Sequence, residues 1–233
     1  GLELENASAD FAQIAIQGPK AEEVLSEALA CSSVHVRERA TPSIEGLSSL
    51  LIARTGYTGE DGFEVFLHNA GARQFWNALL VAGEKFGIKA IGLAARDTLR
   101  LEACYPLHGH EISDHISPLT AGLGWVVKLD AKDFLGADAL RKQKEAGLSQ
   151  KLVALKVRGS GIVREETPIF AQELKSDEAI GKATSGTKVP SQDAPIALAI
   201  ISAEYAKSGT MLSAEVRGRR FDVEVVKKPI YKR

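Results

Sequence analysis

The sequence lacks the features that mark two large classes of protein. No run of about 18 apolar residues occurs, so no segment is suited to cross a membrane as a helix. Neither sign of charge is in excess, since 29 Lys and Arg stand against 30 Asp and Glu, for a formal net charge of -1. A protein that binds nucleic acid through its phosphates normally has a clear surplus of Lys and Arg. We therefore expect no membrane and no nucleic acid among its partners.

Cysteine and methionine are also scarce. The two cysteines, Cys31 and Cys104, lack CxxC spacing and are too few for a disulfide framework. This favours a reducing compartment, which is the cytoplasm, or the mitochondrion in a eukaryote. Met211 is the only methionine, and the chain opens with Gly1 without a signal-like apolar segment. We therefore expect this chain to be the later part of a longer polypeptide.

The short motifs that identify many enzymes by themselves are missing too. The sequence contains no GxGxxG, no GxxxxGK[ST], no GxSxG and no HExxH. Three histidines, His108, His110 and His115, cluster in one stretch, and imidazole is an ordinary zinc ligand. Their spacing matches no familiar zinc pattern, and the stretch is typical of a polar loop that leads into Pro118. We expect no bound metal.

What the sequence does contain is typical of a globular α+β protein. Apolar residues make up 45% of the chain and charged residues 25%, which allows a sizeable core. Hydrophobic periodicity predicts both strands and helices in the first part of the chain. The predicted strands are 11–16, 48–53, 63–67 and 125–129, and the predicted helices are 20–29, 72–86, 93–103 and 136–145.

The pattern changes near residues 147–150. Beyond this point it predicts strands at 152–157, 179–185, 196–202, 211–216 and 221–226, with a tight hairpin turn at Gly218-Arg219. Several short strands joined by turns, with almost no helical pattern, indicate a small β-barrel or sandwich. We therefore predict two domains, an α+β region of antiparallel strands and helices over residues 1–148 and a small C-terminal β-barrel domain over residues 149–233.

A glycine-rich loop between two predicted strands is the first candidate site. The segment TGYTGEDGFE runs from Thr55 to Glu64, and its glycines let a ligand approach the backbone closely. Tyr57 offers a flat face and Glu64 a carboxylate, so the loop is suited to hold a planar ring. The alternative is a purely structural hairpin in which Tyr57 packs as a lid and Glu64 is solvated. The residues by themselves leave both interpretations open.

The predicted helix at 93–103 supplies the second candidate site. Arg96 and Arg100 lie four residues apart on one helix face, where like charges repel by roughly 0.2 to 0.5 kcal/mol. Asp97, three residues before Arg100, is placed to pair with that arginine. Arg96 is then the better candidate to bind a carboxylate or carbonyl of a ligand, because its planar fork suits both groups. The alternative for Arg96 is a structural salt bridge.

These motifs and several others stand in an order that resembles one family. The chain reads ADFAQIAIQGPKAEEVL, then RTGYTGEDGFE, GLAARDTLRLEACYPLHGHEI and PLTAGLGWVVKLD, and later LVALKVRG and the terminal KKPIYKR. In this order and spacing they resemble the aminomethyltransferase of the glycine cleavage system, its T-protein, over essentially the whole chain.

The resemblance implies a tetrahydrofolate-dependent transferase. Such an enzyme takes the aminomethyl group from the lipoyl arm of a carrier, the H-protein, releases ammonia, and leaves the one-carbon unit on tetrahydrofolate, its co-substrate. Residues 1–148 are then the folate-binding region. The resemblance matches Glu64 and Arg96 to residues that contact folate, Tyr57 and Trp125 to aromatic positions beside the folate, and Tyr231 to a C-terminal contact.

The resemblance also implies that a segment of the T-protein is missing from this chain. In T-proteins a further segment, which includes the catalytic aspartate, precedes the position that Gly1 matches, and no aspartate here stands in its motif. We therefore expect the C-terminal two-thirds of a T-protein, with an N-terminally incomplete folate-binding region, no catalytic residue and little or no activity by itself.

Three other interpretations remain open. The first is the folate domain appended to sarcosine or dimethylglycine dehydrogenases, and the second is a non-catalytic folate-binding fragment. The third is a folate-binding protein of iron–sulfur maintenance. It is disfavoured because Thr55-Gly56-Tyr57 stands where those proteins carry a cysteine.

Overall fold

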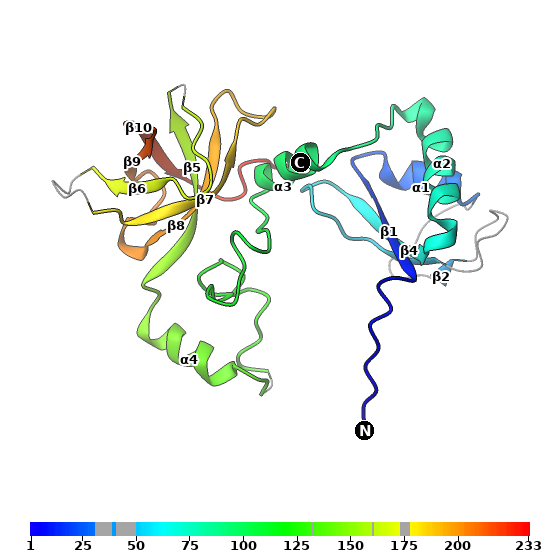
Figure 1. Ribbon diagram of the computed structural model, residues 1–233, viewed down its shortest axis with the longest axis horizontal. Coiled ribbons are helices and arrows are strands. Elements are labelled where there is room, and N and C mark those ends of the chain that lie inside the picture. The colour runs from blue at the N-terminus through cyan, green and yellow to red at the C-terminus, as the bar shows by residue number, and fades with distance from the viewer. Residues whose placement is uncertain (31–38, 41–49, 132, 160, 173–177) are drawn as a thin grey trace. The chain divides into compact units, whose positions relative to one another are not determined.

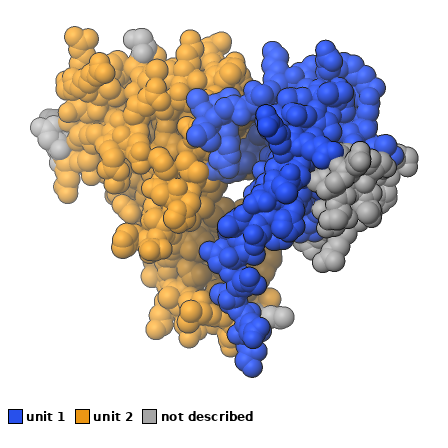
Figure 2. Space-filling view, turned by 45° about the vertical axis from the view of Figure 1, so that its right-hand side comes forward, with its two compact units in different colours: residues 1–96, 233 blue, residues 97–232 orange. Residues whose placement is uncertain are grey.

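The computed structural model of the protein describes residues 1–30, 39–40, 50–131, 133–159, 161–172 and 178–233. They form two compact units, coloured separately in Figure 2: residues 1–96 with Arg233, and residues 97–232. Helices and antiparallel strands occur together, as the predicted α+β class requires. None of the helices in these residues is long and apolar enough to cross a membrane.

The first unit contains a four-stranded antiparallel sheet in the order β1-β4-β3-β2 (Figure 1). Its strands are β1 (Phe11–Gln17), β2 (Arg39–Ala40), β3 (Leu50–Ala53) and β4 (Gly62–His68). Its helices are α1 (Ala21–Ala28) and α2 (Ala72–Gly83), with single 3-10 turns η1 (Asn69–Gly71) and η2 (Glu84–Phe86) on either side of α2. The predicted elements are confirmed, except that residues 48 and 49 of one strand lie outside the described residues and β2 was not predicted.

Alternating burial along β4 shows how the sheet meets its helices. Phe63, Val65 and Leu67 are buried, whereas Glu64 and Phe66 between them are partly exposed. Successive side chains of a strand point to opposite faces of the sheet, so every second residue faces the core. The buried residues form one cluster with side chains of α1 and α2, which therefore cover the same face of the sheet. The opposite face presents Glu64.

Two more helices follow in the chain. α3 (Leu93–Glu102) is the helix predicted at 93–103, and α4 (Ala137–Ala146) is the one predicted at 136–145. α4 ends where Gly147 takes the left-handed φ of 81° that glycine adopts without strain.

The strand predicted at 125–129 is wrong, because this stretch is a series of turns. The N–H of Leu123 donates to the carbonyl of Pro118 at 2.7 Å, and the N–H of Val126 donates to the carbonyl of Leu123 at 3.0 Å. Local hydrogen bonds thus satisfy backbone groups that a strand would pair with a neighbouring strand. Gly122, with a φ of 76°, allows the chain to turn here.

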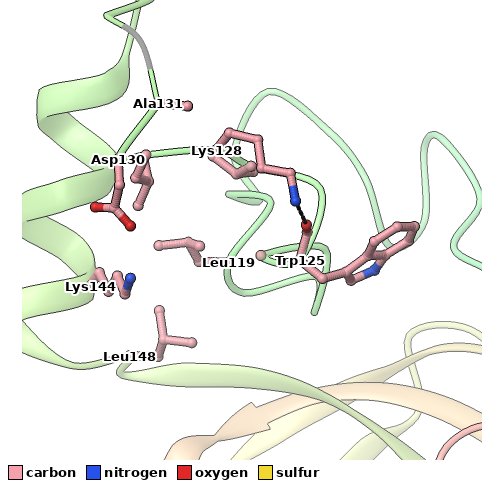
Figure 3. Close-up of a pocket in the computed structure, with 10 residues that line it drawn as sticks. Leu119, Trp125, Lys128, Asp130, Ala131, Lys144 and Leu148 are labelled. Carbon is pink, nitrogen blue, oxygen red and sulfur yellow. Dashed lines mark hydrogen bonds between the residues drawn. The ribbon is translucent and has the colours of Figure 1, made fainter.

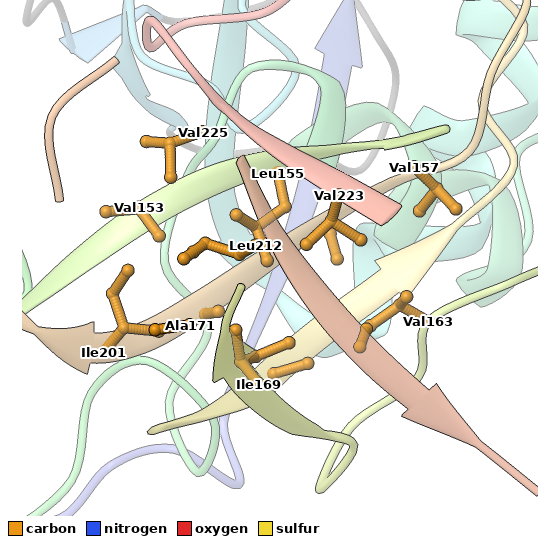
Figure 4. Close-up of a cluster of buried hydrophobic side chains, with 14 residues drawn as sticks. Val153, Leu155, Val157, Val163, Ile169, Ala171, Ile201, Leu212, Val223 and Val225 are labelled. Carbon is orange, nitrogen blue, oxygen red and sulfur yellow. The ribbon is translucent and has the colours of Figure 1, made fainter. Parts of the chain in front are cut away.

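The second unit contains a closed antiparallel barrel in the order β10-β5-β8-β7-β6-β9, as predicted for the C-terminal part. Its strands are β5 (Gln150–Arg158), β6 (Pro168–Ala171), β7 (Gly181–Thr187), β8 (Ile196–Ser202), β9 (Met211–Val216) and β10 (Arg219–Val226), with η3 (Ala203–Tyr205) after β8. Side chains from all six strands fill the interior, with Ala183 from β7 among them. Figure 4 shows Leu155, Ile169, Ile201, Leu212 and Val223 from the other five strands.

Two details of the barrel differ from the prediction. β6 was not predicted, since it is only four residues long and begins with Pro168, which reads as a strand breaker. The hairpin turn between β9 and β10 consists of Arg217 and Gly218, one residue earlier than predicted, because Val216 pairs with Arg219. Both turn residues have positive φ, 53° and 72°, as a type I′ turn requires.

Candidate functional site

The glycine-rich loop joins β3 to β4 and closes over the side chain of Gln17, at the end of β1. The Gln17 Nε2 atom lies 3.1 Å from the Thr55 carbonyl and 3.4 Å from the Phe63 carbonyl, so one amide bonds both ends of the loop. A Cβ on Gly56 would lie 1.8 Å from Gln17 Oε1, and one on Gly62 would lie 2.4 Å from Gln17 Nε2. The Cβ on Gly62 would also lie 2.7 Å from the Ile16 carbonyl oxygen, so position 62 requires glycine for close approach, whereas a Cβ on Gly56 would meet only the end of the Gln17 side chain.

An ion pair closes the base of the same loop. The Arg54 guanidinium contacts Asp61 at 2.5 Å and Glu22 of α1 at 2.8 Å, and it lies 5.1 Å from the ring centroid of Phe63. Arg54 holds the pKa of the Asp61 carboxyl below its usual range, chiefly through this hydrogen bond. The loop is thus fixed by the Gln17 amide, which bonds both of its ends, and by the ion pair of Arg54 with Asp61.

Glu64, which the resemblance matches to a residue that contacts folate, lies on the face of the sheet opposite the two helices. Each of its carboxylate oxygens accepts one hydrogen bond, Oε1 from Gln13 Nε2 at 2.6 Å and Oε2 from the Thr55 hydroxyl at 2.5 Å. Glu64 is thus an oriented carboxylate that is also partly exposed to solvent. A carboxylate has about four lone-pair positions, so it can accept further bonds from a ligand.

Tyr57 and Arg96 lie together in the first unit. The Arg96 guanidinium carbon is 4.6 Å from the centroid of the Tyr57 ring, a cation–π contact. Arg96 itself is exposed, at the start of α3. The structure therefore brings together two of the predicted residues, one from the loop and one from the helix.

Trp125 belongs to the second unit, at the edge of a cavity of about 690 Å³ (Figure 3). The cavity is lined by the apolar side chains Leu119, Val127, Leu129 and Leu148, and by the charged residues Lys128, Asp130 and Lys144 among others. Lys128 Nζ donates to the Trp125 carbonyl at 3.1 Å. The indole is 75% exposed, and Figure 3 shows it directed away from Asp130 and Lys144. The ring is thus free to pack against another surface.

Tyr231, the fifth predicted residue, also belongs to the second unit. Its N–H donates to the carbonyl of Glu102, the last residue of α3, at 2.9 Å. This bond ties the end of the chain to the helix that carries Arg96 and Arg100.

Arg100 shares α3 with Arg96 but has a different environment. Its Nε donates to Asp97 at 2.7 Å, as the spacing predicts. Its side chain is only 1% exposed, and its other donors reach Glu111, the Tyr105 carbonyl and the hydroxyl of Ser185. All of these are groups of the protein, so Arg100 is a structural residue.

His108, His110 and His115 are the candidate metal ligands of the sequence. Among the residues that the structure describes, no group of three or more His, Cys, Asp or Glu side chains could hold a metal ion. His110 Nδ1 instead lies 3.0 Å from the Thr184 carbonyl and 3.1 Å from Glu165 Oε1. Cys104 is a free thiol whose pKa burial raises, which keeps it protonated. Cys31 lies outside the described residues.

Sequence reasoning did not single out Gln13, Gln17 or Arg54, although all three shape the site. Gln13 lies in the strand predicted at 11–16, where a polar residue is ordinarily read as solvent-facing, and Gln17 directly follows that predicted strand, although the observed β1 includes it. Their partners Glu64 and Thr55 are 51 and 38 residues away in the sequence. Only the pairing of β1 with β4 brings them together.

Comparisons with known proteins show the family of the chain. Residues 1–131 match the family described as the GCVT N-terminal domain, and residues 150–232 match the glycine cleavage T-protein C-terminal barrel domain. An aminomethyltransferase of Desulforamulus reducens is 41% identical over 100% of this chain and 63% of its own length. One of Exiguobacterium sibiricum is 44% identical over 99% of this chain and 62% of its own. The chain therefore belongs to the glycine cleavage T-protein family.

A solved structure shows the same fold. The glycine cleavage system aminomethyltransferase T from Bartonella henselae superposes with a TM-score of 0.83 at 33% identity, over 95% of this chain and 60% of that one. The chain thus spans about three fifths of the length of the relatives it matches.

Proposed function

We propose that the protein is a tetrahydrofolate-dependent aminomethyltransferase of the glycine cleavage system. It transfers the one-carbon unit from the aminomethyl-lipoyl group of the H-protein to tetrahydrofolate, its co-substrate, with release of ammonia, in the cytoplasm. Residues 1–148 are the folate-binding region and residues 149–233 the barrel domain. Membership of the T-protein family supports this proposal, and the oriented carboxylate of Glu64 is the observation that favours it most.

The chemistry of the pterin ring explains why a carboxylate matters. The pyrimidine edge of a pterin presents adjacent N–H donors, which one carboxylate can accept as a pair. Glu64 is held with both oxygens in place and with lone pairs to spare. Tyr57 and Arg96 then offer a ring face and a planar cation for the rest of the folate. For Trp125 and Tyr231, the assignment to the folate site rests on the resemblance alone.

Holding the folate contributes to catalysis by position. When the folate amine is bound next to the carrier's aminomethyl carbon, their bimolecular reaction becomes effectively unimolecular. Such positioning supplies a large share of the rate enhancement in many enzymes. In the proposed mechanism Glu64, Tyr57 and Arg96 bind and orient the folate and move no proton.

The test is a titration with tetrahydrofolate of the full-length protein and its Glu64→Ala variant. Losing a charge-assisted acceptor should weaken binding by about 1.5 to 3 kcal/mol. Glu215→Ala is the matched control, since Glu215 is a strand carboxylate of the barrel that pairs with Arg220. The control should bind as the parent does. If Glu64→Ala also binds as the parent does, at matched stability, the pterin role of Glu64 is wrong.

A further inference from the structure

Glu64 is held from both sides by residues of different strands. β4 lies between β1 and β3 in the sheet. Gln13 reaches Oε1 from β1, and Thr55 reaches Oε2 from just beyond the end of β3. A carboxylate bonded at each oxygen from opposite flanks cannot rotate without breaking one of the two bonds. The direction of its remaining lone pairs is therefore fixed before any ligand arrives.

The residues beside Glu64 leave that carboxylate accessible. In the sheet register Glu64 is directly opposite Ala15 on β1 and Ala53 on β3. Residues directly opposite one another project to the same face of a sheet. Both neighbours on this face are therefore methyl groups, which leave room for a flat ring to approach the carboxylate in the plane where its lone pairs point.

Resting on the proposed function, we propose that Gln13 is a positioning residue that, together with Thr55, makes Glu64 selective for the amino-substituted pyrimidine edge of the folate. Gln13 does not contact the folate in this arrangement. It fixes the carboxylate so that both oxygens meet two adjacent ring donors at once. Without Gln13 the carboxylate is held at Oε2 alone, by Thr55, so it can turn about that one bond and discriminates less between one ring donor and two.

A cycle of protein variants and ligands tests this. Tetrahydrofolate and its analogue without the 2-amino group differ in one donor on the edge that Glu64 meets. The parent protein should prefer tetrahydrofolate by about tenfold or more, as expected for a hydrogen bond to a charged group. Gln13→Leu keeps the size of the side chain and removes its donor, and it should reduce this preference to about threefold or less. Thr55→Val, which removes only the hydroxyl, should act in the same direction.

Two controls separate positioning from a general effect. Gln172→Leu removes the same kind of bond elsewhere, since Gln172 Nε2 donates to Asp222 Oδ1 at 2.9 Å in the barrel unit, and it should leave the preference unchanged. Glu64→Gln replaces one of the two acceptor oxygens with an NH2 donor, so the side chain can no longer accept two adjacent ring donors, and the preference should be lost. Thermal unfolding of each variant shows whether it is folded, and the exposed position of Gln13 favours a folded variant.

The possible results point to different conclusions. Equal losses of affinity for both ligands in Gln13→Leu would mean a merely structural role for Gln13 and would overturn this inference, even with the proposed function intact. The inference is also overturned if Glu64→Gln loses the preference for tetrahydrofolate while Gln13→Leu and Thr55→Val both keep it. If the parent fails to bind tetrahydrofolate, or if Glu64→Gln keeps the preference, the folate site itself is misassigned and the proposed function fails with it.

Discussion

Arg100 and Glu111 form an ion pair in the interior of the second unit, with Nη1 of the arginine 3.0 Å from Oε2 of the glutamate and side-chain exposures of 1% and 0%. Glu111 also accepts bonds from the Thr184 and Ser185 hydroxyls, and from the N–H of Leu107. No buried side-chain N or O atom lacks a hydrogen-bond partner in the described residues. The pair therefore joins α3 and the loop after it to β7 of the barrel.

We expect Arg100→Ala to lower the free energy of unfolding of the second unit by about 3 to 5 kcal/mol, because it leaves a buried carboxylate without its charge partner. Asp97→Ala removes only the half-exposed partner of the same arginine and should cost less than about 1 kcal/mol. Urea denaturation of both variants measures the difference. Equal effects would show that Asp97, and not Glu111, is the partner that matters.

A double variant tests the same pair from the other direction. Replacing both partners of a buried ion pair by apolar residues of similar volume is often nearly neutral. Arg100→Met with Glu111→Leu should therefore unfold at a higher urea concentration than Arg100→Met alone. If the double variant is less stable than the single one, the two side chains are not coupled through their charges.

The sequence predicts part of this network and misses the rest for a physical reason. The pair Asp97–Arg100 follows from helical spacing alone, because residues three apart share a face. The bond from Arg100 to Ser185 spans 85 positions, and no local pattern signals it. The burial of Arg100 is likewise a product of barrel packing. Local spacing thus predicts local partners, whereas a buried charge depends on the tertiary fold.

The same distinction explains which elements the sequence predicts. β8 (Ile196–Ser202) and β4 (Gly62–His68) have enough apolar residues between turn signals to be recognised as strands. Trp125 to Leu129 has the same apolar character and forms turns instead. Apolar runs of five residues fit a strand or a packed loop equally well. Only the preceding glycines, Gly122 and Gly124, indicate the loop.

The contact between Arg96 and Tyr57 supports a prediction on ligand binding. Arg96→Lys keeps the positive charge and loses the planar guanidinium that lies over the ring. A cation–π contact at an exposed site is worth about 0.5 to 1 kcal/mol, so stability should change little. Tetrahydrofolate affinity should fall several-fold in titration of the full-length protein. Arg100→Lys is the matched control, and it should reduce stability more than folate affinity. The reverse order would contradict the roles given to the two arginines.

The ion pair at the base of the loop predicts a pH dependence. Arg54 lowers the pKa of the Asp61 carboxyl in the folded state. Such a carboxyl stabilises the fold above its unfolded pKa, about 4, and this contribution is lost as the pH falls through the lower folded value. Asp61→Asn should therefore be less stable than the parent near neutral pH, by less than about 1 kcal/mol since both groups are partly exposed.

Melting temperatures of parent and Asp61→Asn, taken between neutral pH and about pH 2, measure this dependence. The two curves should converge as the pH falls. A constant gap over the whole range would mean that the ionisation of Asp61 does not stabilise the fold.

The close approach of Gly56 to Gln17 supports the last prediction. A Cβ at position 56 would lie 1.8 Å from Gln17 Oε1 and 2.6 Å from Gln17 Cδ, so Gly56→Ala must displace the glutamine from its bonds to both ends of the loop. Because the displaced atoms lie at the end of a flexible, partly exposed side chain, the cost should be about 1 kcal/mol, the low end of the range for overpacking. Combining Gly56→Ala with Gln17→Ala removes the obstacle. The losses in the free energy of unfolding of the two single variants should therefore sum to more than the loss in the double variant.

Gly87→Ala is the control, because Gly87 has open space around it. Its cost comes from left-handed φ strain and not from a clash, so this cost should not change when Gln17→Ala is added. Chemical denaturation of the single and double variants gives the coupling free energy directly. Strict additivity of Gly56→Ala and Gln17→Ala would show that the loop does not rest on the Gln17 side chain.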